Sequence, residues 1–207
     1  TKEEADILGK VFNLSPYEAL VNKFEPGLNI KLITDVFDDL QQFLIPLIDT
    51  IIEKQKSQKI LPIQDKISEE QQKDIAEYIM RLIGFDFKRG RLDKSAHPFC
   101  GGSTNDVRIT TRYNADNPFS SLDGVMHETG HAMYELNLPE KWSHQPVGKS
   151  RGMAMHESQS LMIEMQITRS KAFKKFLSTV LKEKFNFADN AFKPENLYLL
   201  GTRVEKS

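Results

Sequence analysis

The chain has 207 residues, with 28 Lys and Arg against 29 Asp and Glu, for a formal net charge of −1. This length allows one domain with a sizeable core, and the balanced charge gives no electrostatic case for nucleic acid or an anionic membrane. No apolar run approaches the ~20 residues of a membrane span, and no signal peptide opens the chain. The single cysteine, Cys100, excludes an internal disulfide and fits a reducing compartment as a packed thiol.

Helices are predicted for the first two-fifths of the chain. Ser15 to Glu18 has the pattern of a capping box with Pro at the first helical position. Apolar residues then recur every three or four positions from Ile33 to Ile51, which indicates a helix with a core-facing stripe that Pro46 should kink or split. A second capping box at Ser68 to Gln71 heads a helix that Gly84 is expected to end.

The middle of the chain has a different pattern of apolar and polar residues. Helical periodicity is lost from residue 85 to 117, and residues 106–113 alternate strictly, so Val107 and Ile109 face one way while Arg108 faces the other. This pattern predicts a strand, followed by a turn and a helix. Further helices are predicted from residue 152 to 185 and from 194 to the end of the chain. The fold class is therefore mainly α with a small β-sheet.

The most informative motif is His-Glu-x-x-His at positions 127–131. On a helix, residues four apart share a face, so His127 and His131 can hold one Zn²⁺. Glu128 lies beside them and is placed to take a proton from a water that the metal activates. Two surface histidines on an amphipathic helix are the alternative interpretation.

A catalytic zinc usually has three protein ligands. Positions 134 and 137 are Tyr and Asn, so the metzincin pattern fails. The other common solution is a glutamate on a second helix, and Glu157 supplies one, 26 residues after His131. It belongs to a polar His-Glu-Ser-Gln cluster in an otherwise apolar helix, and such groups need partners when buried.

Several nearby polar residues have more than one interpretation. His156 could donate to a substrate carbonyl, orient a ligand, or be a core histidine, and Glu164 could support the metal or form a surface ion pair. Arg108 could hold a peptide carboxylate or pair with Asp106, and His97 is equally ambiguous. For His144, in a polar loop, a surface role is favoured.

Four motifs in register resemble the carboxypeptidase Taq, or thermostable carboxypeptidase, family of zinc metallocarboxypeptidases. They are His97-Pro98-Phe99, Asp106-Val107-Arg108-Ile109-Thr110, His127-Glu128-Thr129-Gly130-His131 and His156-Glu157-Ser158-Gln159. Softer similarity covers nearly the whole chain, including Glu25-Pro26-Gly27 and Gly90-Arg91-Leu92-Asp93.

The resemblance implies a helical HExxH metallopeptidase architecture with the metal at the floor of a groove, next to the small sheet. It implies release of single C-terminal residues from peptides with broad specificity, in a homodimeric cytoplasmic enzyme. Carried over by residue, it implies His127, His131 and Glu157 as ligands of Zn²⁺, with Co²⁺ as a second option, and Glu128 as the base. His97 and Arg108 fall in motifs that the family places near the substrate, and we also expect His156 to contact the substrate.

The chain also departs from the family. Leu161-Met162-Ile163 stands where members often have Arg-Leu-Trp, and two later motifs, Ile-Arg-x-x-Ala-Asp and Gly-x-x-Gln-Asp-x-His-Trp, are absent. We therefore expect residues 1–207 to be one incomplete domain, the middle of a longer protein, that is poorly active alone and prone to self-associate. The competing interpretations are an endo-oligopeptidase or aminopeptidase on the same metal core, and a non-catalytic helical segment with a vestigial metal site.

Overall fold

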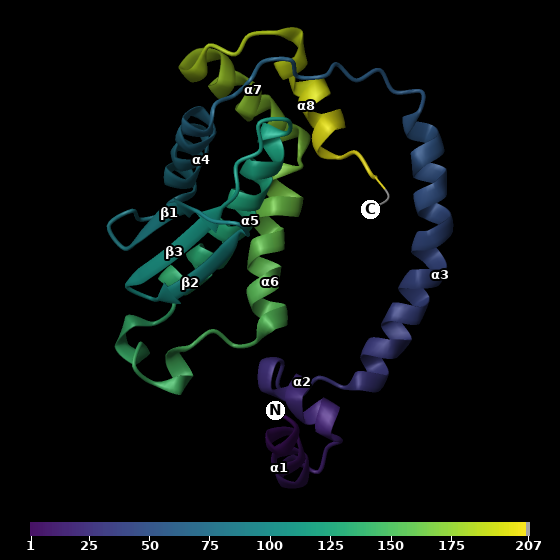
Figure 1. The fold of residues 1–207 in the computed structure, drawn as a ribbon, viewed down its shortest axis with the longest axis vertical. Helices are drawn as coiled ribbons and strands as arrows, with labels where there is room; N and C mark the ends of the chain where they lie inside the picture. The colour runs from purple at the N-terminus through teal and green to yellow at the C-terminus, as the bar shows by residue number, and fades with distance from the viewer. Residues whose placement is uncertain (206–207) are drawn as a thin grey trace. The chain divides into compact units, whose positions relative to one another are not determined.

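The computed structural model describes residues 1–205, which form two compact units (Figure 1). The first contains residues 1–58, 151–155 and 204–205, and the second contains residues 59–150 and 156–203. None of the helices in the described residues is both long enough and apolar enough to cross a membrane.

The first unit is helical, with helices α1 (Lys2–Phe12), α2 (Pro16–Phe24) and α3 (Ile30–Gln55). Helix α1 packs against α2, and the predicted capping box is present, since the Ser15 side chain accepts a hydrogen bond from the Glu18 backbone N–H. Helix α3 runs through Pro46 as one helix of 26 residues, so of the two effects predicted for Pro46, a kink or a split, the split does not occur. Its stripe was also expected to face a core, whereas Val36 and Phe37 of that stripe are 45% and 64% exposed.

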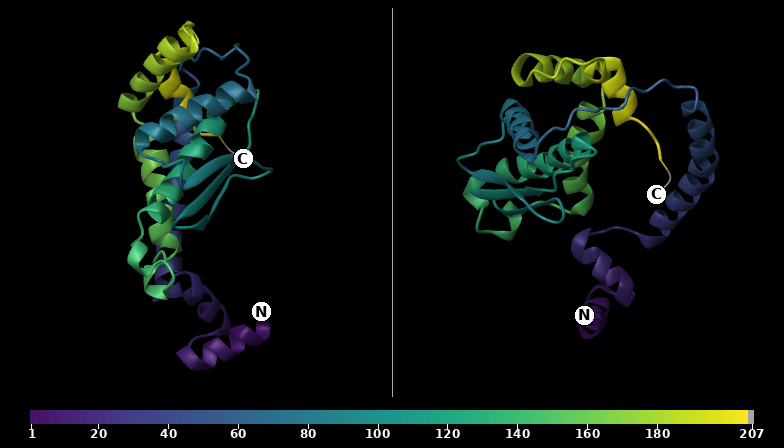
Figure 2. Two further views of the ribbon diagram at one scale, coloured as in Figure 1. Left: turned by 90° about the vertical axis from the view of Figure 1, so that its left-hand side faces the viewer. Right: turned by 45° about the horizontal axis from the view of Figure 1, so that its top comes forward.

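The second unit combines helices with one sheet (Figure 2). Its regular elements are helix α4 (Glu69–Ile83), strands β1 (Gly90–Lys94), β2 (Phe99–Ser103) and β3 (Asp106–Thr111), helix α5 (Pro118–Leu136), the short turns η1 (Glu140–Trp142) and η2 (Pro146–Gly148), helix α6 (Met153–Leu161, whose residues 153–155 belong to the first unit), the π-helical segment η3 (Met162–Thr168), helix α7 (Lys171–Phe185), the turn η4 (Asn190–Phe192) and helix α8 (Pro194–Gly201).

Strand β3 is the centre of the sheet, parallel to β1 and antiparallel to β2. Its alternation is the predicted one: Val107 and Ile109 are fully buried. The register pairs Ile109 with Leu92 on β1 and with Cys100 on β2, so one face of the sheet is apolar. This face joins the core formed with α4, α5 and α7. The sequence predicted β3 and a small sheet but not the two partner strands.

Helix boundaries agree with the capping signals and differ elsewhere. Helix α4 begins after the predicted Ser68 capping box and ends at Gly84, whose φ of 105° suits glycine. The single helix predicted from 152 to 185 is interrupted after Thr168, and Ser170 caps a new one. Helix α8 begins at Pro194 as predicted but ends at Gly201; residues 206 and 207 of its predicted extension lie outside the described residues.

Candidate metal centre

Helix α5 presents the two motif histidines on one face. The Asn117 side chain caps it by accepting a hydrogen bond from the Ser120 N–H, and Pro118 occupies its first turn. Val125 and Met126 are fully buried and fix the helix against the sheet. The imidazole rings of His127 and His131 therefore lie side by side, with centroids 4.9 Å apart.

A close helix crossing brings Glu157 to these rings. The Cα of Gly130 approaches the backbone of α6 so closely that an added Cβ would lie 2.5 Å from the Gln159 oxygen and 2.5 Å from the Ser160 Cα. Only a glycine lets two helix backbones approach to this distance without displacement. Gly130 of the motif thus determines how near α6 lies to α5.

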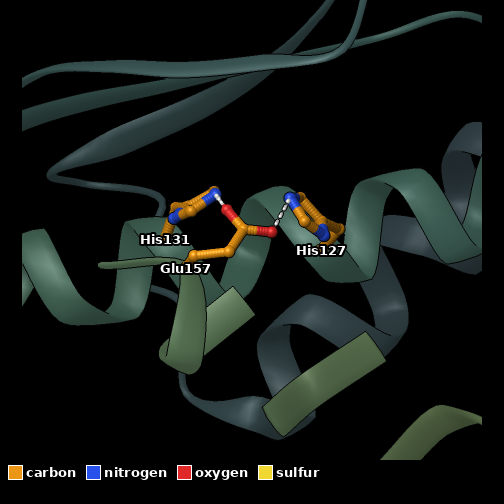
Figure 3. Close-up of side chains that lie close together, drawn as sticks. All are labelled: His127, His131 and Glu157. Carbon is orange, nitrogen blue, oxygen red and sulfur yellow. Dashed lines mark ion pairs between the residues drawn. The ribbon is translucent and has the colours of Figure 1, made fainter. Parts of the chain in front are cut away.

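Glu157 lies between the two imidazoles (Figure 3). Its Oε2 is 3.3 Å from His131 Nε2, and its Oε1 is 3.6 Å from His127 Nε2. Ligand atoms of the three residues all lie within 4.8 Å of one another. Two imidazole nitrogens and one carboxylate oxygen are a donor set that Zn²⁺ accepts in catalytic sites, so the residues fit a divalent metal of this kind.

The Nδ1 atom of His127 has a carboxylate partner. It lies 2.9 Å from Glu164 Oε2, and the other oxygen of Glu164 accepts a hydrogen bond of 2.7 Å from Arg169. Glu164 lies on the π-helical segment η3, directly after α6. A neutral imidazole that donates through Nδ1 keeps its Nε2 lone pair for a metal, so the bond to Glu164 favours the ligating form of His127.

His131 is supported through a second histidine. Its Nδ1 lies 2.6 Å from His156 Nδ1, and His156 Nε2 lies 2.7 Å from Glu135 Oε1. Both ring nitrogens of His156 are therefore engaged inside the protein. Of the three roles considered for His156, this geometry matches the orientation of a ligand.

Glu128 is mostly buried beside the three ligand candidates, with 8% of its surface exposed. Burial raises the pKa of its carboxyl group, and the Glu157 carboxylate adds to the rise, while His127 and His156 oppose it. Burial also lowers the pKa of His131, helped by His156 and His127, so this imidazole stays neutral to a lower pH than usual. A carboxylate with a raised pKa is better matched to accept protons near neutral pH.

The other predicted substrate residues lie apart from this cluster. Arg108 is on the face of β3 opposite Val107 and Ile109, and its guanidinium donates to Asp106 at 2.8 and 3.1 Å. Of the two interpretations of Arg108, the ion pair is present, within one strand. The His97 side chain is exposed, and its carbonyl accepts a hydrogen bond from Thr110. Among residues 1–205, no hydrogen bond or ion pair joins His97 or Arg108 to the metal-ligand candidates.

Glu135 and Arg169 were not predicted from the sequence. Glu135 follows His131 by four positions, so the same spacing rule that pairs the motif histidines could have selected it. Arg169 gives no such signal, because its approach to Glu164 depends on the π-helical turn. Cys100 is a packed thiol as expected: burial raises its pKa to about 12, with smaller effects from the charges of Glu128 and Glu135.

Comparison with known proteins agrees with this cluster. The sequence profile of the family described as Carboxypeptidase Taq (M32) metallopeptidase matches residues 1–207. The chain is 37% identical to Thermostable carboxypeptidase 1 of Pyrococcus furiosus over 201 residues, which are 96% of this chain and 40% of that protein. It is 34% identical to Thermostable carboxypeptidase 1 of Thermus thermophilus, over 94% of this chain and 42% of that protein.

Solved structures give the same result. The fold matches Trypanosoma cruzi metallocarboxypeptidase 1 with a TM-score of 0.93 and 40% identity, over 100% of this chain and 42% of that one. The M32 carboxypeptidase from Deinococcus radiodurans matches with a TM-score of 0.81 and 30% identity, over 88% of this chain and 37% of that one. The chain thus spans less than half the length of the relatives it matches.

Proposed function

The chain belongs to the carboxypeptidase Taq (M32) metallopeptidase family, and on this premise we propose that the protein releases single C-terminal residues from peptides of broad sequence. The observation that carries the proposal is the convergence of His127, His131 and Glu157, whose ligand atoms lie within 4.8 Å of one another. We assign these three residues as ligands of Zn²⁺, with Co²⁺ as the second candidate, because two imidazoles and one carboxylate form a typical catalytic zinc set.

The chain's own residues would carry the proton transfers. When bound, the metal lowers the pKa of a water molecule and polarises the scissile carbonyl. Glu128, mostly buried next to the ligands, would accept the proton from that water and deliver it to the departing amine. Its raised pKa, caused first by burial, suits both steps, because the carboxyl group is then neither too weak a base nor too weak an acid.

Recognition of the substrate is assigned to residues near the sheet. We propose that Arg108 and His97 contact the C-terminal end of the peptide, since a guanidinium can hold a carboxylate with two parallel hydrogen bonds. Arg108 would have to exchange its bond to Asp106 for the substrate, which is feasible because both side chains are 54% exposed. A substrate role for His156 stays a prediction. It would require one of its two ring nitrogens, both of which already have partners, to exchange that partner for the substrate.

Three further properties belong to the same proposal. Holding a terminal carboxylate tightly takes more than one donor, so we expect the 207 residues by themselves to turn peptides over slowly. We also propose a homodimer for the whole protein and a cytoplasmic location, the latter consistent with a single cysteine kept as a thiol. Size determination of the whole protein tests the dimer, and fractionation of cells tests the location.

The decisive experiment compares a peptide with its C-terminally amidated twin, using the whole protein loaded with zinc. We expect the free peptide to lose one residue at a time from its C-terminus and the amidated twin to resist, because the amide removes the charge that arginine would hold. Equal cleavage of both would show an endo-oligopeptidase or aminopeptidase instead. No cleavage of either by protein that has bound one zinc would show a non-catalytic helical protein.

A further inference from the structure

The contact between His131 and His156 restricts where their protons can be. The two Nδ1 atoms lie 2.6 Å apart, which is hydrogen-bond distance, so one of them carries a proton and the other accepts it. A neutral imidazole has a proton on only one of its two nitrogens. The choice made at this contact therefore fixes the state of the outer nitrogen, Nε2, in both rings.

Only one of the two choices leaves His131 able to bind a metal. If His131 donates through Nδ1, its Nε2, which faces Glu157 at 3.3 Å, keeps a lone pair. His156 then accepts at Nδ1 and carries its own proton on Nε2. In the opposite arrangement His156 donates from Nδ1, and His131 has its proton on Nε2, where the metal would bind.

Glu135 selects between these two arrangements. Its Oε1 lies 2.7 Å from His156 Nε2, and an ionised carboxylate can only accept a hydrogen bond. A proton on His156 Nε2 satisfies this contact, whereas a lone pair there would face a carboxylate oxygen. The pair is also shielded from water, since Glu135 and His156 have side-chain exposures of 24% and 18%. A charge-assisted hydrogen bond in such surroundings is stronger than one at the surface.

We propose that Glu135 is a positioning residue that sets the tautomer of His131 through His156, and so prepares the His131 Nε2 atom to bind the metal. The proposal rests on the metal centre proposed above and adds to it a supporting carboxylate two hydrogen bonds from the ligand. In His127 the same tautomer, with the proton on Nδ1, is favoured directly by the Glu164 carboxylate, which lies 2.9 Å from that nitrogen. The two ligand histidines thus depend on different carboxylates, which lets one be perturbed while the other serves as an internal reference.

The test is nitrogen NMR of the histidine rings in the metal-free whole protein, which reports the nitrogen that carries the proton. We expect His131 protonated on Nδ1 in the wild type and a shift toward protonation on Nε2 in Glu135→Ala, with His127 unchanged. In Glu135→Gln the amide can either accept or donate a hydrogen bond. We therefore expect the fraction of His131 protonated on Nδ1 to lie between that of the wild type and that of Glu135→Ala. Glu77→Ala is the matched control, because Glu77 is also a partly exposed glutamate, with a side-chain exposure of 25%, paired with its own helix neighbours.

Zinc affinity provides the second readout, measured by competition with a chromogenic chelator. Loss of a partner of this kind typically weakens metal binding about 10- to 100-fold, which is the effect expected for Glu135→Ala and not for Glu77→Ala. If Glu135 acts through His156, Glu135→Ala should add no further loss in a His156→Ala background. An additional loss of the full size there would overturn the proposal.

The outcomes separate this inference from the proposed function. If the wild type binds zinc, yet the His131 tautomer and the zinc affinity are the same in Glu135→Ala as in Glu77→Ala, the inference alone is wrong. If the wild type binds no zinc, or binds it equally well after His131→Ala, the metal centre itself is wrong and the inference falls with it.

Discussion

Each imidazole of the candidate metal centre has one nitrogen engaged inside the protein and the other facing Glu157. The Nδ1 atom of His127 contacts Glu164, whereas the Nδ1 atom of His131 contacts His156. Glu157 has 44% of its side chain exposed, so the ligand cluster is open on the side of this carboxylate. The ability of His127 and His131 to bind a metal therefore depends on Glu164 and His156, which orient the two imidazoles without being ligands themselves.

Replacement of Glu128 is expected to separate catalysis from metal binding. In the whole protein, Glu128→Gln keeps the size and polarity of the side chain but removes the proton acceptor. We expect peptide turnover to fall by about 10²- to 10⁴-fold, the usual contribution of a general base. Zinc content should stay at the wild-type level, and a loss of activity accounted for by a loss of zinc would show that Glu128 has another role.

Cys100 gives a prediction about pH. Its pKa is raised to about 12, chiefly by burial, whereas an unfolded cysteine loses its proton near the ordinary value of 9.0. Between these two values the folded state keeps a proton that the unfolded state has lost, so this group's contribution to stability declines as pH rises from about 9 to about 12. Alkylation by iodoacetamide at pH 9 should be roughly 500-fold slower than for a free cysteine, because the thiolate is the reactive form and its fraction falls from about one half to about one thousandth. A rate like that of free cysteine would contradict the burial argument.

The metal-ligand candidates could be predicted from the sequence, whereas most of the residues that hold these ligands in place could not. His127, His131 and Glu128 follow from helical spacing alone, and Glu157 follows from the need to explain a polar cluster in an apolar helix. Glu135 shares the helix face of His131 at a spacing of four, but its contact with His156 on another helix could not be read from that spacing. No local pattern signals the contact of Arg169 with Glu164. Whether His97 and Arg108 contact substrate stays a prediction, since their present contacts are with the sheet and its turn.

At the scale of elements, the crossing of α5 and α6 decides whether the site exists. A Cβ at position 130 would lie within 2.5 Å of backbone atoms of α6, and backbone atoms cannot move aside as a flexible side chain can. Gly130→Ala should therefore displace α6, destabilise the protein by about 1–3 kcal/mol, and weaken zinc binding because Glu157 moves with the helix.

A second glycine on the same helix serves as the control for this prediction. A Cβ at Gly124 would meet only the Pro98 ring at 3.7 Å, an ordinary van der Waals contact. Because alanine favours helix more than glycine does, Gly124→Ala should be neutral or stabilise the protein by up to about 1 kcal/mol. Chemical denaturation and zinc titration of both variants measure the effects. Equal behaviour of the two alanine variants would show that the close crossing is not needed.

Helix ends were predictable where the capping residue can be recognised in the local sequence, either as a serine side chain or as a glycine. Ser15, Ser68 and Gly84 act as their local sequence indicates. The break after Thr168 was missed although residues 168–171 contain no apolar side chain and Ser170, which caps α7, is a recognisable N-cap residue. The π-helical form of residues 162–168 has no such signal in the sequence. Pro46 failed to split α3 since a long helix tolerates the loss of one internal hydrogen bond.

At the scale of the whole molecule, α3 has an apolar face that the other described helices of its own unit leave exposed. The large apolar residues exposed on this helix are Leu32, Val36, Phe37, Leu40, Phe43, Leu44 and Ile45. Contiguous exposed apolar surface favours association, so we expect the 207-residue chain to self-associate at micromolar concentrations. Sedimentation velocity should show this, and Phe37→Lys with Phe43→Glu should reduce it without changing zinc affinity. A wild-type chain that stays monomeric at all concentrations would contradict this expectation.

The proposed metal centre depends on His127, His131 and Glu157 as ligands, and equilibrium dialysis against Zn²⁺ tests them directly. We predict one zinc per chain in the wild type, severe loss of binding in His127→Ala, His131→Ala and Glu157→Ala, and full binding in Glu128→Gln. His144→Ala is the control, because His144 is exposed in the loop after α5. Zinc binding that survives the three ligand substitutions, or that falls equally with His144→Ala, would show that the metal is not held by these residues.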